Sequence, residues 1–270
     1  MNQAQQRGVV LIVVLWITVL LTVLLVAFTA TIKVDRTVAT DIVQRAQARA
    51  GAEAVLNYLV AIQQSDPDML SGMVRQVYTL NLNLMDVRFR FIPETAFISL
   101  NAAPFDDLAA AFNEAGADNA AQIAQYIIDR RTGMLAAELN DGFEASLQQP
   151  WTSTVELATV PIVSADVYQR IQGWLTVDSE HQDVNFDFAD TDILRALKGN
   201  AAEQILADRD VRAVTNNGLD AGLNDIFRVQ VELTSSSSKR KIEATVAFSG
   251  GKHGYHVVRW NEYNTHFYLD

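Results

Sequence analysis

The 270-residue chain has no cysteine and only five prolines. Without cysteine it can form no disulfide framework, no thiolate nucleophile and no cysteine-ligated metal centre. Basic side chains are also scarce, since 21 lysines and arginines face 32 acidic residues, for a net charge of −11. Phosphate binding depends on lysine and arginine, so nucleic acid is not an expected partner. The acidic balance suits an exported domain that does not adhere to anionic lipid headgroups.

Signatures of catalysis are absent as well. The sequence contains no G-x-S-x-G, no H-E-x-x-H and no P-loop. His253 and His256 lie three positions apart, where the alternation of a strand places them on opposite faces. We therefore expect a protein that is not an enzyme and has no cofactor. The alternative is a signal-anchored periplasmic enzyme or binding protein with an unrecognised site.

Charge is missing from one long segment. Directly after Arg7 and Gly8, the 24 residues from Val9 to Ile32 carry no charged side chain. At about 1.5 Å per helical residue this segment spans roughly 36 Å, against a bilayer core of about 30 Å. It is too long for the apolar part of a secretory signal, and no A-x-A cleavage site follows it. We predict a transmembrane helix over residues 9–32, whose orientation the nearly balanced flanking charges leave open.

The helical pattern continues beyond this segment. Apolar residues recur at fourfold spacing from Val34 to Ala54, with Gly51 as the one helix breaker before Gln64. The first part is apolar all round and the second is amphipathic. Asp66 and Pro67 then predict its end. We expect one N-terminal helix over residues 9–65.

Strands are predicted on both sides of a helical region. Alternation predicts strands at 87–92, 97–100, 226–233, 242–248 and 255–260, with a solvated hairpin at 234–239. Residues between Asn101 and Gly218 are predicted to form short helices. The fold class is therefore α+β, with an all-helical block inserted into one antiparallel sheet. The expected parts are 66–100 and 219–270 for the sheet and 101–218 for the block.

The helical block contains a weak internal repeat, in which residues 98–108 match residues 184–194. Asn101 and Asp187 are predicted to open a helix as cap or turn residues. Each of these helices is followed by a glycine joint and a second helix. The first joint is Gly116, followed by a helix at 120–131, and the second is Gly199, followed by a helix at 201–208. This pattern indicates two helical hairpins of the helix-hairpin-helix or SAM-like type. Since the two joints carry a single lysine, Lys198, they are interpreted as packing modules rather than a phosphate cradle.

Six acidic residues and no basic one fall between residues 178 and 192. Asp183, Asp187 and Asp190 are candidate calcium ligands, because calcium takes oxygen ligands. An EF-hand loop is excluded, since Phe188 stands at the turn glycine and Leu194 at the closing glutamate. Helix capping and a solvated loop are the favoured use of these residues.

Several segments in order resemble the general secretion pathway protein K family, the largest minor pseudopilin of bacterial type II secretion. Residues 98–108 and 184–197 resemble the family's two N-x-N-x-A-P-x-x-x-L segments, the second having Ala189 and Asp190 in place of Ala-Pro. The other matching segments are 6–11, 151–157, 227–231, 242–246 and 257–260. The chain departs from the family at Arg130–Gly133, where relatives often carry a long acidic loop, which puts a calcium site on that loop in question.

The resemblance implies a processed membrane protein. A prepilin peptidase would cleave the leader 1–8 between Gly8 and Val9, and the new terminus would be methylated. The chain would cross the inner membrane once, with a cytoplasmic N-terminus and a periplasmic C-terminal domain. Most pilins carry glutamate at the fifth mature position, which is Val13 here.

The resemblance also implies a role and a set of partners. The protein would nucleate and cap the tip of the periplasmic pseudopilus, for export of folded proteins across the outer membrane. Its expected partners are other minor pseudopilins in a tip complex, with secreted substrates and the outer-membrane secretin as further candidates.

Overall fold

The structure is a computed structural model that describes residues 3–82, 85–133, 149–215, 226–234, 239–248, 254–262 and 269. It describes no side chain at 3–12, 30, 31, 34, 67, 68, 71 and 210–215. The chain divides into two units, residues 1–50 and 51–270. Helices combined with an antiparallel sheet confirm the predicted α+β class.

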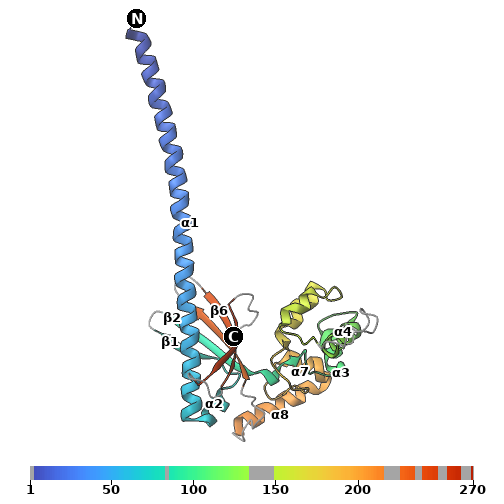
Figure 1. The fold of residues 1–270 in the computed structure, drawn as a ribbon. Coiled ribbons are helices and arrows are strands. Elements are labelled where there is room, and N and C mark those ends of the chain that lie inside the picture. The colour runs from blue at the N-terminus through green and yellow to red at the C-terminus, as the bar shows by residue number, and fades with distance from the viewer. Residues whose placement is uncertain are drawn as a thin grey trace. The chain divides into compact units, whose positions relative to one another are not determined.

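Helix α1 runs without interruption over Gln3–Ser65, which confirms the predicted helix and its end (Figure 1). No proline interrupts it, and the chain turns where the sequence predicts. The Asp66 carboxylate accepts a 3.0 Å hydrogen bond from the Met69 amide at the start of α2, Pro67–Met73. Pro67 occupies the first position of α2, where its missing N–H has no cost.

Five strands form one antiparallel sheet in the order β1-β2-β5-β6-β7. The predicted strands at 87–92, 226–233, 242–248 and 255–260 are confirmed, within a few residues at their ends. The hairpin tip at 235–238 lies outside the described residues. β1 was not predicted. The bounds are β1 Tyr78–Leu82, β2 Met85–Pro93, β5 Ile226–Thr234, β6 Lys239–Ala247 and β7 His256–Asn261.

The C-terminal part of α1 packs on the apolar face of this sheet. In the register of β2 and β5, Phe91 pairs with Val229 and Phe89 with Val231, and all four are buried. Tyr58 of α1 meets the Phe89 ring edge-on, with 6.2 Å between centroids. This face is the core predicted from the alternation of the strands.

Gly51 lies where α1 contacts the sheet. A Cβ built on Gly51 would lie 2.4 Å from Cδ2 of Leu233 and 3.5 Å from Cγ2 of Val87. Glycine at this position, despite its poor helix propensity, fits this contact, because a side chain here would require Leu233 to move.

The opposite face of the sheet is polar and is buried as well. Alternation along β5 places Arg228, Gln230 and Glu232 on this face, and residues 227–233 are all buried. The polar side chains pair across the strands. Arg88 of β2 pairs with Glu232 at 3.5 Å, and Gln230 accepts from Arg90 at 2.8 Å while donating to Glu243 at 3.1 Å. Burial of these groups is possible because each has a partner.

The segment between β2 and β5 contains mostly short helices in its described residues, and Figure 1 shows these helices gathered beside one another. The predicted strand at 97–100 is short, and it does not join the main sheet. As β3, Ile98–Ser99, it pairs in parallel with β4, Leu175–Thr176. The remaining elements are η1 Glu94–Ala96, α3 Phe105–Glu114, α4 Ala120–Thr132, η2 Thr154–Thr159, α6 Ala165–Ile171, η3 Gln172–Trp174, α7 Thr191–Lys198, η4 Gly199–Ala201 and α8 Ala202–Thr215.

Candidate functional sites

The first candidate site is the apolar part of α1. From Val13 to Phe28, thirteen large apolar side chains are exposed, with exposed fractions from 50% at Val13 to 71% at Trp16. They point in all directions around the helix, because they follow one another with few polar interruptions. Monomeric soluble proteins rarely expose a contiguous apolar surface of this extent, so this surface is suited to lipid or partner helices.

The hydroxyl groups within this apolar part are satisfied by the helix itself. Thr18, Thr22 and Thr29 donate to backbone carbonyls one turn earlier, at 2.8, 2.7 and 2.8 Å. A polar group in an apolar medium needs an internal partner of this kind. The threonines are therefore compatible with an apolar environment on every side of the helix.

The residues predicted to be processed lie in the same helix. Gly8 and Val9 are helical. In the predicted span 9–32, the side chains of 9–12, 30 and 31 lie outside those described. In the part of the chain that the structure describes, no helix is long and apolar enough to cross a membrane. Val13, the position that is acidic in most pilins, is exposed.

The second candidate site is the acidic loop. Asp183 is exposed, while Asp187 and Asp190 are half-buried. The Asp187 amide donates to the Asn185 side chain at 3.1 Å, and the Asp190 carbonyl accepts from the Leu194 amide at the start of α7. Among the described residues, no group of three or more acidic, histidine or cysteine side chains could hold a metal ion.

Both helical hairpins are present, with differences in detail. Gly116 and Gly199 have positive φ angles of 84° and 51°, a conformation that favours glycine at the joints. The second helix of the first hairpin is confirmed at Ala120–Thr132, and that of the second continues to Thr215, beyond the predicted end. Asn101 and Asp187 were predicted to be cap or turn residues, and both lie in turns. Neither caps a helix, because α3 and α7 begin only after Pro104 and Asp190.

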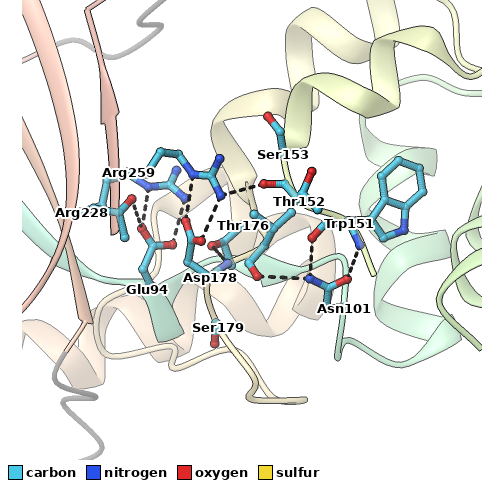
Figure 2. A network of polar contacts seen from close by, with 12 residues as sticks. Glu94, Asn101, Trp151, Thr152, Ser153, Thr176, Asp178, Ser179, Arg228 and Arg259 are labelled. Atoms are coloured by element: carbon cyan, nitrogen blue, oxygen red, sulfur yellow. Dashed lines mark hydrogen bonds and ion pairs between the residues drawn. The ribbon is translucent and has the colours of Figure 1, made fainter. Parts of the chain in front are cut away.

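The third candidate site is a polar junction between the sheet and the helical block (Figure 2). Its centre is a buried ion pair between Arg228 of β5 and Glu94, the residue that follows β2. Nε and Nη2 of Arg228 donate to the two Glu94 oxygens at 3.0 and 2.9 Å. Nη2 also donates to the Leu175 carbonyl of β4 at 3.1 Å.

The surroundings of this ion pair favour its charged form. The Glu94 side chain is fully buried, and the Arg228 guanidinium lies 3.7 Å from the centre of the Phe97 ring. Burial by itself lowers the pKa of Arg228, but attraction to Glu94 and Glu243 outweighs it, and the net pKa is raised. Arg228 is therefore a permanent cation inside the protein, and it is stable there because a bidentate carboxylate faces it.

A second arginine repeats this arrangement nearer the surface. Nε and Nη2 of Arg259, on β7, donate to the two Asp178 oxygens at 3.1 and 3.0 Å. Nη2 also donates to the Thr152 carbonyl at 2.8 Å. Figure 2 shows Arg228 and Arg259 close together, each directed toward its own carboxylate. Each arginine thus links a strand of the sheet to a carboxylate and a carbonyl of the segment inserted in it.

Asn101 and the Trp151 segment extend the junction into the block. Nδ2 of Asn101 donates to the carbonyls of Trp151 and Val177 at 2.9 and 3.2 Å, and its Oδ1 accepts from the Trp151 amide at 2.8 Å. Trp151 is buried, with the Arg130 guanidinium 3.9 Å from its ring centre. Asn101 is therefore a bridge between two backbone segments rather than a helix cap.

Residues 151–157, which carry part of the sequence resemblance, form a capping box. Ser153 caps η2, and the Glu156 carboxylate accepts from the Ser153 amide at 3.1 Å. Partial burial would raise the pKa of Glu156, but hydrogen bonds from Thr152 and Arg130 outweigh it and hold the pKa below its ordinary value. The carboxylate is thereby kept ionised beside Arg130, its ion-pair partner.

The junction was not predicted from the sequence. Arg228 and Glu94 are 134 positions apart, and Arg259 and Asp178 are 81 apart. A weak signal existed: Arg228 stands between Phe227 and Val229 in a strand, next to a helical insertion that has to be held in place. Alternation alone does not show that the face carrying this arginine is buried.

Comparison with solved structures finds similar chains, one of which belongs to a secretion complex. No family model and no curated protein matches the chain significantly. One chain of the crystal structure of the GspK-GspI-GspJ complex, from the enterotoxigenic Escherichia coli Type 2 Secretion System, resembles it with a TM-score of 0.47 and 15% identity. The match covers 81% of this chain and 100% of that chain. At 15% identity the similarity concerns the fold alone.

Proposed function

We propose that this protein is a membrane-inserted, non-enzymatic assembly subunit, a minor pseudopilin of a type II secretion system. The observation that carries the proposal is helix α1. Its residues 13–29 expose apolar side chains on every side, whereas residues 51–65 of the same helix are buried on one side by the sheet. A filament subunit needs both properties. One part of its helix lies in lipid or in a helical bundle, and the other part packs on its folded domain.

The exposed apolar surface is too large to remain in water. Fully burying one large apolar side chain contributes about 1.5–3 kcal/mol. The thirteen side chains from Val13 to Phe28 are 50–71% exposed, so burying their exposed parts would contribute roughly 10–25 kcal/mol, against a whole stability of about 5–15 kcal/mol for a typical domain. We infer that this part of α1 lies in the inner membrane before assembly and among partner helices afterwards.

Processing by a prepilin peptidase is the step that separates a pseudopilin from an ordinary signal anchor. The proposed cleavage between Gly8 and Val9 would remove Arg7 and leave a mature protein that begins with the apolar helix. Glycine at the cut allows the protease to approach the backbone closely. The helix then keeps its cytoplasmic N-terminus in a single pass, with the domain in the periplasm, and the new terminus is methylated.

The test of processing is a Gly8→Leu substitution in cells that carry the peptidase. We expect the precursor to accumulate, whereas Gln5→Leu, which lies outside the cut, should be processed as the natural protein is. Intact mass of the membrane-extracted protein distinguishes the two forms. A natural protein that retains residues 1–8 would refute the pseudopilin proposal and favour a signal anchor.

The finer part of the proposal places the subunit at the filament tip. A glutamate at the fifth mature position is thought to neutralise the terminal amine of the next subunit, and this chain has Val13 there. A carboxylate without a partner is costly in an apolar medium, so a subunit with nothing ahead of it favours an apolar residue. The helical block between β2 and β5 also adds bulk that would obstruct stacking above it. The proposed partners are the other minor pseudopilins of a tip complex.

Labelling tests the tip position. Protein tagged on its periplasmic domain should appear once per filament, at the end distal to the membrane, and should co-purify with other minor pseudopilins. Val13→Glu should bring no gain in assembly. Label repeated along the shaft would contradict the tip position while leaving the pseudopilin class intact.

A further inference from the structure

The two arginines of the junction have the same design. Arg228 and Arg259 each use Nε and Nη2 to bind both oxygens of one carboxylate, and each donates a further bond to a backbone carbonyl. The planar fork of a guanidinium matches a carboxylate in one relative orientation, so a bidentate pair restricts rotation as well as distance. Two such pairs side by side restrict the relative orientation of the segments that they join.

Each ion pair joins two different parts of the chain, the sheet and the segment inserted in it. Glu94 is the first residue after β2, where the chain leaves the sheet. Leu175 and Asp178 belong to β4 and the turn after it, and Thr152 precedes η2. The arginines lie on β5 and β7, so each pair joins the sheet to the inserted segment.

Stability alone does not account for the buried pair. Replacing a buried ion pair by apolar side chains of similar volume is often neutral or stabilising, because two charges lose their hydration. Here Arg228 and Glu94 satisfy each other, and Thr245 adds a 3.4 Å hydrogen bond to the same carboxylate. What the ion pair adds beyond an apolar contact is a fixed geometry.

We propose that Arg228 and Arg259 are positioning residues that hold the helical block in one orientation on the sheet. The block is then a preset rigid surface rather than a mobile appendage. If the proposed function is correct, this is the surface that the subunit presents to its partners, and the orientation does not have to be selected during assembly. The orientation itself does not depend on the proposed function.

A spin-label distance measurement tests this proposal directly. Because the chain has no cysteine, Thr79→Cys on β1 and Gln204→Cys on α8, both at exposed positions, give two unique labelling sites. In the full-length protein in detergent micelles, we expect one narrow distance distribution. Arg259→Ala should cause loss of this narrow peak, and Arg228→Met combined with Glu94→Met should do so even where the unfolding midpoint is unchanged.

Matched variants separate positioning from folding. Arg259→Lys keeps the charge but loses the fork, so it should give an intermediate width at an unchanged thermal midpoint. Arg195→Ala removes an exposed pair with Glu203 inside the block and should leave the distribution as narrow as in the natural protein. A narrow distribution in both Arg259→Ala and the double Met variant would overturn the proposal. If these variants widen the distribution while the natural protein keeps its leader uncleaved, the pseudopilin function is refuted and this inference stands.

Discussion

Helix α1 contains two parts that differ in how their apolar side chains are distributed around the helix and in what covers them. In residues 13–29 apolar side chains follow one another on all sides, and the large ones are at least half exposed. In residues 51–65, Val55, Leu56 and Leu59 are buried, while Glu53 and Asn57 on the other side are exposed. A one-sided apolar pattern indicates a single partner surface, here the sheet, and an all-round pattern indicates a surrounding medium. The difference shows that periodicity, more than total hydrophobicity, distinguishes a helix that packs on its own domain from one whose apolar side chains need lipid or other helices around them.

The largest expected effect comes from placing charge in the first part. Leu20→Arg combined with Leu21→Arg should disfavour insertion by about 5–7 kcal/mol, since one arginine at the centre of a membrane helix costs about 2.5–3.5 kcal/mol. The protein should shift to the soluble fraction on alkaline carbonate extraction. Asn57→Arg, on the exposed side of the second part, should stay in the membrane fraction. Equal extraction of both variants would remove the distinction between the two parts.

Truncating one leucine in each part should have unequal effects on the domain. Leu59→Ala removes a fully buried side chain and should lower the free energy of unfolding by about 2–5 kcal/mol. Leu21→Ala, at a position that is 70% exposed, should leave the urea unfolding transition of the detergent-solubilised domain where it is. A shift of similar size in both variants would mean that residues 13–29 also belong to the folded core.

Gly51 offers a smaller and more local test of the contact between α1 and the sheet. Gly51→Val forces a side chain against Leu233 and Val87 and should destabilise the domain by about 1–3 kcal/mol. Gly72→Ala is the matched control, because a Cβ at Gly72 meets no atom within 4 Å. We expect its thermal midpoint to be equal or slightly higher, since alanine favours a helix. An unchanged midpoint for Gly51→Val would show that α1 is not held tightly at this position.

Local patterns made most of the fold predictable. The long helix followed from the absence of proline, and its end followed from Asp66 and Pro67. The central strands followed from alternation, as in residues 87–92. β1 was missed although Leu80, Asn81 and Leu82 alternate as a strand does. The parallel pairing of β3 with β4 was missed because it joins segments 77 residues apart.

The polar junction shows the limit of sequence reasoning most clearly. Alternation predicts correctly that Arg228 lies on the face opposite Phe227, but not that this face is buried. The outcome depends on Glu94, which is distant in sequence and arrives there only through the fold. Asn101 was noticed as part of the repeat, yet its bonds to Trp151 and Val177 also depend on long-range packing.

Cysteine accessibility in spheroplasts tests the central claim most directly, because the natural chain has no cysteine. Leu21→Cys and Asn57→Cys place one thiol in each part of α1. In spheroplasts treated with a membrane-impermeant maleimide, we predict that the thiol at position 57 is modified and that the thiol at position 21 stays unreactive until detergent is added. Modification of position 21 at the same rate as position 57, before detergent, would contradict the account.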